Sequence, residues 1–123
     1  MGEKAEKTRY SDSELAEFEL IIEDKLSEAR KQLEFYAQQL SESANNSDSK
    51  SKGLDDSIGS AENEQISTLA SRSRKYIQHL ENAKLRIQNK VYGICRETGK
   101  LISKERLKAV PHATLSIEAK NKR

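Results

Sequence analysis

Two apolar stripes with helical spacing constrain the fold of this chain more than any other feature. The first stripe recurs at steps of three or four residues and comprises Leu15, Phe18, Ile22, Leu26, Ala29, Leu33, Tyr36 and Leu40. The second alternates steps of three and four throughout and comprises Ile66, Leu69, Ser73, Tyr76, Leu80, Ala83 and Ile87. Stripes of this kind are typical of long helices that pair along a narrow seam.

The segment between the stripes is polar and predicts a connection at the tip of a helical hairpin. Residues 41–60 are rich in Ser, Asn, Asp and Gly, which favour turns and loops. Two stripes of similar length with a flexible connection can fold back on each other. We therefore expect a monomeric antiparallel coiled-coil hairpin over residues 11–91, with a tip loop at about 41–60. Self-association through the same seam is the competing arrangement.

Both ends of this hairpin carry local signals. Ser11 and Glu14 fit a capping box, so the first helix should begin there, after a flexible N-terminus of residues 1–10. Gly93 is expected to be the residue that follows the second helix. Residues 92–123 then form a small irregular knob, with a turn at 98–100, a break at Pro111 and a short terminal helix.

Composition narrows the class of protein. Hydrophobic residues make up 34% of the 123 residues, charged residues also 34%, and Trp is absent, which is too little apolar material for a thick globular core. An all-α fold is expected. No apolar run reaches the roughly 18 residues that a membrane helix needs. The charged N-terminus lacks a signal-peptide pattern, and the single Cys95 cannot form an internal disulfide. These features favour the cytoplasm.

Charge is divided unevenly along the chain. Residues 1–65 hold 16 acids and 8 bases, a net charge of −8, whereas residues 66–123 hold 4 acids and 14 bases, a net charge of +10. An acidic first half lying against a basic second half would support an antiparallel hairpin. The alternative is that both are solvated faces with little mutual attraction.

Four positions in the knob have the spacing of zinc-finger ligands, although only one of them is a cysteine. Two residues separate Cys95 from Thr98, two separate Ser116 from Ala119, and 17 residues lie between the two pairs. This frame resembles the C-x2-C, 17-residue, C-x2-C finger of the DksA/TraR family. Zinc normally needs four Cys or His ligands, and Cys95 is the only family ligand kept. With His112 as the sole nearby substitute, no zinc is expected.

Without a metal, the knob must be held together by its apolar residues, namely Tyr92, Ile94, Leu101, Ile102, Leu107, Val110, Leu115 and Ile117. Cys95 is interpreted as a small buried hydrophobe rather than a reactive thiol. His79 is interpreted as a solvated helix residue rather than a base. Because the chain also lacks a phosphate-binding glycine motif, an enzyme is not expected.

The resemblance covers most of the chain and implies a function. Family members are bacterial regulators that bind RNA polymerase, insert the hairpin tip into its secondary channel and modulate initiation. On this basis Asp55 and Asp56 are the candidate tip residues close to the polymerase active site. The structural alternative is that they only cap the second helix. Guanosine tetraphosphate and polymerase contacts are implied for Arg72, Arg106 and Lys120. Val110 and His79 stand where the family often has basic residues.

Two other functions remain compatible with these patterns. The hairpin could serve as a structural coiled-coil adaptor that pairs with a partner helix. The basic C-terminal region could instead bind nucleic acid without sequence preference. Aromatic residues do not interleave with its bases, so sequence-specific DNA binding is not expected.

Overall fold

The structure, a computed structural model, describes residues 8–49 and 54–122, with side chains described for 8–43 and 61–122. Four helices make up the described part of the chain: α1 (Asp12–Ser49), α2 (Leu54–Gln88), α3 (Lys104–Ala109) and α4 (Ile117–Asn121). Over the same residues the one β interaction is an isolated antiparallel bridge between Ile94 and Leu101. The all-α class and the pair of long helices are confirmed. Within the described residues, no helix is both long and apolar enough to span a bilayer.

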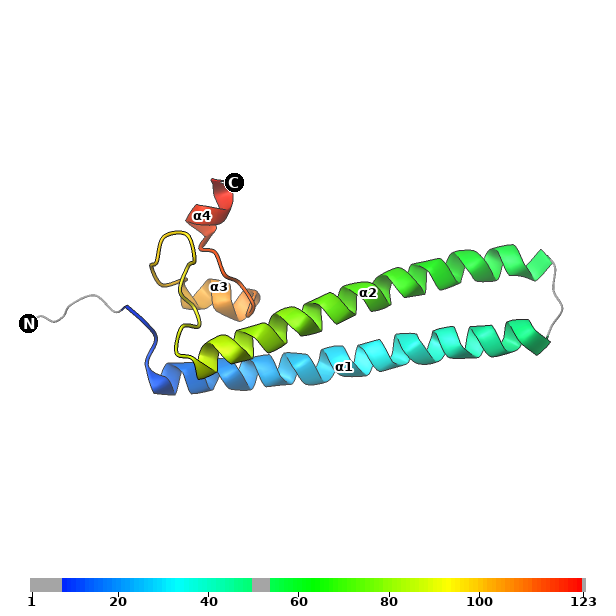
Figure 1. Cartoon of the computed structure of the whole chain (residues 1–123), viewed down its shortest axis with the longest axis horizontal. Helices are drawn as coiled ribbons and strands as arrows, with labels where there is room; N and C mark the ends of the chain where they lie inside the picture. The colour runs from blue at the N-terminus through cyan, green and yellow to red at the C-terminus, as the bar shows by residue number, and fades with distance from the viewer. Residues whose placement is uncertain (1–7, 50–53, 123) are drawn as a thin grey trace, which may run out of the picture. The chain divides into compact units, whose positions relative to one another are not determined.

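The chain divides into two compact units. The terminal unit contains the residues up to Leu26 and those from His79 onward, and the middle unit contains Ser27–Gln78. Each unit therefore includes one stretch of α1 and one of α2. In both units these stretches run side by side in opposite directions (Figure 1).

The first helix begins where its capping residues predict. The Ser11 backbone N–H donates to Glu14 Oε1 at 2.9 Å, and the Glu14 N–H donates to Ser11 Oγ at 3.2 Å. This reciprocal pair satisfies two backbone donors that the helix leaves open. Tyr10, just before the cap, is buried together with Leu15 in the first turns, which is the placement of a hydrophobic staple.

The connection predicted at residues 41–60 is longer than the one between the two helices in the structure. α1 continues to Ser49 and α2 begins at Leu54. Residues 50–53 lie outside the described part. Ser, Asn and Asp cost a helix less than about 1 kcal/mol each, and no Pro interrupts this segment. Adding turns to an existing helix is much easier than starting one, so both helices extend beyond their apolar stripes.

The second helix ends earlier than Gly93 suggested. α2 stops at Gln88, and Lys90 takes the left-handed conformation with φ of 66°. The Lys90 N–H donates to Ile87 O at 3.0 Å and the Val91 N–H donates to Arg86 O at 2.9 Å. These two bonds form a Schellman motif, which glycine usually provides. The sequence prediction for this helix end was wrong because Lys occupies the glycine position.

Gly93 has a different role: it leaves room for Tyr10 of the N-terminal segment to pack against the backbone. Its φ is 80°, and a Cβ built there would lie 2.7 Å from Tyr10 Cε2 and 3.1 Å from Leu107 Cδ1. Real Cβ atoms do not tolerate the first distance. The Tyr10 ring therefore occupies the space that any other residue at this position would need.

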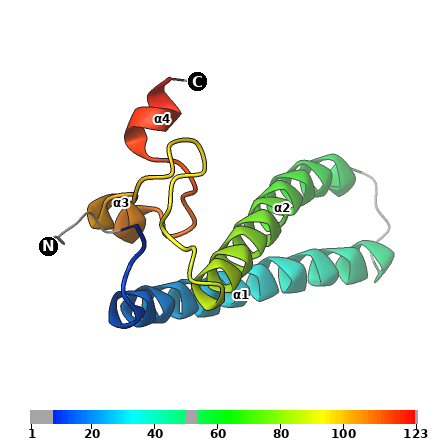
Figure 2. The same cartoon turned by 60° about the vertical axis from the view of Figure 1, so that its left-hand side comes forward.

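Aromatic rings connect the helices of the terminal unit to the knob. Tyr10 packs edge-on against Phe18 with centroids 5.6 Å apart, and Phe18 packs against Tyr92 at 5.3 Å. Both tyrosine hydroxyls donate to knob carbonyls: Tyr10 to Ile102 O, and Tyr92 to Pro111 O at 2.8 Å. Figure 2 shows α3 and the loop before it gathered near this end of the two long helices, with α4 farther out.

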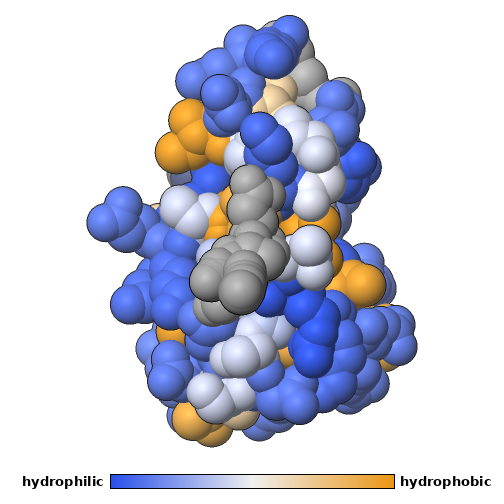
Figure 3. Space-filling view, turned by 90° about the vertical axis from the view of Figure 1, so that its left-hand side faces the viewer, coloured by the Kyte–Doolittle hydropathy of each residue, from blue (hydrophilic) through white to orange (hydrophobic). Residues whose placement is uncertain are grey.

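The core of the terminal unit draws on every element in it. Its buried residues come from α1, α2, the loop, α3 and α4, and they include Leu15, Ile22, Leu26, Leu80, Ala83, Ile87, Cys95, Leu107, Ala113 and Ala119. Exposed apolar residues in this unit are separate in sequence: Leu20, Leu85, Val91 and Ile117. The face in Figure 3 is accordingly mostly hydrophilic with scattered apolar groups.

The middle unit is a simpler pair of helix stretches. Among its described side chains, only Ala29 and Ala70 are buried. The larger stripe residues are half-buried: Leu33, Tyr36, Leu40, Ile66, Leu69 and Tyr76. Phe35 is 56% exposed and packs beside Tyr36 with ring centroids 6.0 Å apart. The seam predicted from the sequence is therefore present here, although it is shallow.

Acidic residues of the first half do lie against basic residues of the second half in the terminal unit. The ion pairs are Glu23–Lys84 at 3.2 Å, Asp12–Lys90 at 2.7 Å and Glu14–Lys104 at 2.7 Å. A hydrogen bond from Lys90, aided by its charge, lowers the pKa of Asp12. Each pair has at least one exposed partner, so the pairs stabilise by little and orient the elements more than they hold them.

Candidate functional site

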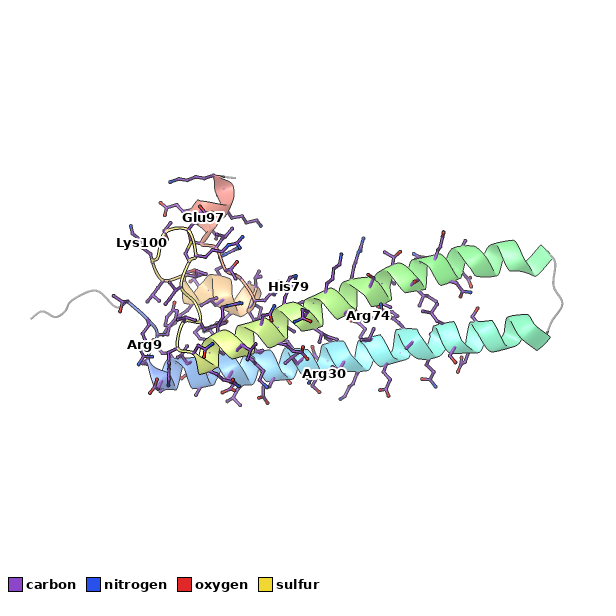
Figure 4. The ribbon with its side chains drawn as sticks, viewed as in Figure 1. Arg9, Arg30, Arg74, His79, Glu97 and Lys100 are labelled. Carbon is purple, nitrogen blue, oxygen red and sulfur yellow. The ribbon has the colours of Figure 1, made fainter. Side chains whose placement is uncertain are left out.

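The loop that holds Cys95 is a tight knuckle. The Cys95 N–H donates to Lys100 O and the Gly99 N–H donates to Cys95 O, both at 2.8 Å. Gly99 has φ of 74°, which a glycine adopts without strain. The turn expected at residues 98–100 is therefore present. Figure 4 labels Glu97 and Lys100 on this loop, and both residues are exposed.

The Cys95 sulfur accepts a hydrogen bond from the segment before α4. The Ser116 N–H donates to Sγ at 3.4 Å. Burial of Cys95 opposes ionisation, but the polar groups of Thr98, Ser116 and Glu97 outweigh it and lower the pKa of the thiol to about 6. The lowered pKa favours the thiolate form of Cys95.

The burial predicted for Cys95 is confirmed, since the residue is 1% exposed. Its surroundings are partly polar, because the Ser116 N–H bonds the sulfur. The low reactivity that the sequence suggested stays a prediction, and the lowered pKa of the thiol argues against it.

The structure brings the finger positions together, and only one of them has a metal-binding side chain. Thr98 Oγ1 accepts from the Lys100 N–H at 3.2 Å. Ser116 Oγ caps α4 by accepting from the Ala119 N–H at 3.1 Å. Ala119 has no donor atom, so one thiolate remains where a closed site needs four ligands. Within the described residues, no three His, Cys, Asp or Glu side chains are grouped to hold a metal ion.

The predicted basic contacts divide between the two units. Arg106 is half-buried on α3, and its Nε donates to Leu115 O at 2.8 Å, which binds α3 to the segment before α4. Lys120 is exposed on α4. Arg72 is exposed on the α2 stretch of the middle unit. Arg106 therefore has a structural task that the sequence did not reveal.

The candidate tip residues lie in the first turn of α2. Because this helix begins at Leu54, Asp55 and Asp56 follow its start and do not occupy the N-cap position. Carboxylates in a first turn interact favourably with the helix dipole. Their side chains lie outside the described part, and their functional role stays a prediction.

The two histidines form a pair that no pattern in the sequence indicated. The rings of His79 and His112 stack with centroids 5.4 Å apart and planes 8° apart. Arg86 Nη2 donates to the His112 carbonyl at 3.4 Å. The two residues are far apart in the sequence, on α2 and after α3, and no motif links them. Only the return of the chain after α3 brings them together.

Comparison with known proteins places this geometry in a family. Residues 90–123 match the model of the prokaryotic dksA/traR C4-type zinc finger. Over 89% of its length, the chain resembles the structure of transcription factor DksA2 from Pseudomonas aeruginosa, with a TM-score of 0.81, 25% identity and 82% of that chain covered. These matches support membership of the DksA/TraR family.

Two curated proteins are also similar to this chain. It is 43% identical over 51 residues to the RNA polymerase-binding transcription factor DksA of Caulobacter vibrioides (strain NA1000 / CB15N). It is 35% identical over 52 residues to General stress protein 16O of Bacillus subtilis (strain 168). The matches take in 42% of this chain in both cases, and 36% and 32% of the relatives. The chain therefore spans about a third of the length of the curated relatives it matches.

Proposed function

We propose that this protein is a bacterial, cytoplasmic transcription regulator that binds RNA polymerase and acts by docking, without catalysis of its own. The supporting relative is the Caulobacter vibrioides protein, whose name states polymerase binding. One observation carries the proposal. An antiparallel pair of long helices and a knuckle with finger spacing occur in one chain, on a fold shared with a DksA2 structure.

We infer that the helix pair enters the polymerase secondary channel. Residues 32–71 hold two basic residues, Lys50 and Lys52, against seven acidic ones, a net charge of −5, and the acidic residues are Glu34, Glu42, Asp48, Asp55, Asp56, Glu62 and Glu64. An acidic projection suits an approach to a catalytic Mg²⁺, because carboxylates change the field around a bound cation. Asp55 and Asp56 are the residues proposed to deliver that charge during initiation.

Binding is tested with purified core RNA polymerase and the full chain. We expect co-elution of the two, and competition with another protein that occupies the secondary channel. An adaptor that pairs with a partner helix would show no such competition. Absence of binding at micromolar concentrations would reject the proposal.

The role of the tip is tested separately from binding. Asp55→Asn with Asp56→Asn is expected to keep polymerase binding and to reduce the effect on initiation in vitro at saturating protein. The matched control is Glu62→Gln with Glu64→Gln, which removes two charges farther along the same helix. If both double variants lose activity equally, total charge and not the tip position is responsible.

Guanosine tetraphosphate is expected to contribute little to this member of the family. Arg106 already donates its Nε to Leu115 O, and His79 and Val110 replace basic residues. The polymerase affinity measured with and without the nucleotide should therefore be similar. A tenfold gain in affinity would contradict this expectation.

A second candidate function rests on the exposed bases of the terminal unit. Six of them lie on the knuckle, α3, α4 and the adjoining residues: Arg96, Lys100, Lys104, Lys108, Lys120 and Lys122. Such a surface could bind nucleic acid through its phosphates. A salt series with duplex DNA tests this, since phosphate binding weakens steeply as salt increases. Weak, salt-insensitive association would exclude it.

A further inference from the structure

A pair of imidazole rings joins α2 to the turn after α3 in the terminal unit. His79 projects from α2, where Figure 4 labels it, and is exposed. His112 is half-buried and follows the buried Pro111. Their rings are nearly parallel, with centroids 5.4 Å apart. Two imidazole rings from segments far apart in the sequence therefore face each other.

The charges around this pair are basic. Burial first, and then the nearby His79, Arg86 and Arg106, lower the pKa of His112. Arg86 belongs to α2 and bonds the His112 carbonyl, and Arg106 belongs to α3 and bonds Leu115 O. Tyr92 also approaches through its bond to Pro111 O, but burial raises its pKa and keeps it neutral. Protonation of the pair adds charge to a site that already holds two guanidinium groups.

We propose that the His79–His112 stack is an acid-sensitive latch between α2 and the turn Val110–Ala113. While both rings are neutral, they stack and hold the turn against α2. When they are protonated, like charges face each other beside Arg86 and Arg106, and the rings separate. This proposal is independent of polymerase binding.

The opening should be local. The Tyr92 hydroxyl still holds Pro111 O, and the Ala113 N–H still donates to Val110 O at 2.9 Å. Pro111 itself is fully buried. The groups freed by protonation are therefore the two rings and the bond from Arg86 to the His112 carbonyl, at 3.4 Å. The aromatic core beneath the turn should remain intact.

The direction of the pH effect follows from the lowered pKa. The unfolded chain takes up a proton at His112 near the ordinary value of 6.5, whereas the folded protein does so at a lower pH. Below 6.5 the unfolded state thus binds more protons than the folded state. The stabilising effect of the latch is complete above 6.5 and is lost as the pH falls from there through the folded pKa.

The experiment uses the fact that the chain has only two histidines. NMR titration of the imidazole Hε1 signals gives two curves, assigned with His79→Gln and His112→Gln. We expect a His112 midpoint below 6.5. His79→Gln should raise that midpoint, whereas Lys84→Gln, which removes a cation elsewhere on α2, should not. The NOE between the rings should be present at pH 7.5 and disappear below the lower midpoint.

Three results would overturn the latch. The first is a His112 midpoint at or above 6.5, and the second is an unchanged midpoint in a folded His79→Gln variant. The third is an inter-ring NOE that persists after both rings are protonated. If His112→Gln does not fold, the wild type and His79→Gln alone still decide among these outcomes.

Discussion

The terminal and middle units contain the same two helices and the same apolar periodicity, yet they bury their seams to different depths. Ile22, Leu26 and Leu80 in the terminal unit are at most 1% exposed, whereas Leu33 and Leu69 in the middle unit are half-buried. The terminal unit adds the knob, whose residues cover the seam. In the middle unit the described core consists of the two helix stretches alone. A heptad pattern therefore predicts which residues face a partner, and other elements decide how completely they leave water.

The largest expected difference comes from truncating one leucine in each unit. Leu107→Ala removes a fully buried side chain of the terminal unit and should lower the free energy of unfolding by about 2–5 kcal/mol. Leu69→Ala in the middle unit should cost roughly half as much or less, because water already reaches that side chain. Urea unfolding followed by circular dichroism measures both. Equal losses would remove the distinction between the units.

A glycine pair tests how closely the terminal unit is packed. Gly93→Ala places a Cβ 2.7 Å from the Tyr10 ring and also strains a positive φ, so a loss of at least about 2 kcal/mol is expected. Gly99→Ala also places a side chain at a positive φ, but a Cβ at that position has no neighbour within 4 Å. This change should therefore lower the free energy of unfolding by only about 1–2 kcal/mol. Combining Gly93→Ala with Tyr10→Ala should cost less than the sum of the single changes.

The shallow seam of the middle unit should be easy to improve. Ser73 occupies a stripe position on α2 and is half-buried. Ser73→Leu would restore the apolar pattern and should raise the free energy of unfolding by about 1 kcal/mol. Ser71→Leu, at an exposed position two residues away, is the control and should change stability little. A destabilising Ser73→Leu would show that the seam has no room for a larger side chain.

The effect expected at Cys95 depends on pH and is smallest near pH 6. The donors around Sγ lower its pKa to about 6 in the folded protein, from an ordinary value of 9.0. Between these values the unfolded state binds more protons, so stability should rise with pH from 6 to 9 and lose this contribution as the pH falls through 6. Cys95→Ser should flatten that rise. Thiolate absorbance at 240 nm should report a midpoint near 6, and a midpoint above 8 would contradict the donor geometry.

Zinc content remains the direct check on the knuckle. The absence of zinc is a prediction from the donor set, because only Cys95 among the four finger positions has a metal-binding side chain. Elemental analysis of purified protein should find well below one zinc per chain. Stoichiometric zinc that a chelator removes with loss of stability would show that the ligands come from elsewhere.

Much of the fold could be predicted because its signals are local. The two apolar stripes, from Leu15 to Leu40 and from Ile66 to Ile87, follow from helical periodicity. Ser11 and Glu14 begin α1 through hydrogen bonds between residues three positions apart. The helix ends were predicted less well. Ser and Asn between 41 and 49 resemble a loop in composition but continue α1, and Lys90 ends α2 in a conformation expected of glycine.

The candidate site was predicted only in outline. The spacing of Cys95, Thr98, Ser116 and Ala119 identified the knuckle and the family, and it indicated that the zinc ligands are missing. It did not show that the Ser116 N–H bonds the sulfur, that Arg106 bonds Leu115 O, or that His79 meets His112. Each of these depends on where the backbone returns after α3.

The sequence by itself determined the paired helices, the capped start of α1 and the loss of three of the four family ligands from the knob, because each depends on residues close together in the chain. Only the tertiary structure decided the depth of the two seams, the Tyr10 ring over Gly93, the Ser116 bond to the Cys95 sulfur and the histidine stack. These features join segments far apart in sequence. Their energies depend on burial and on distances of a few ångströms, which no local pattern encodes.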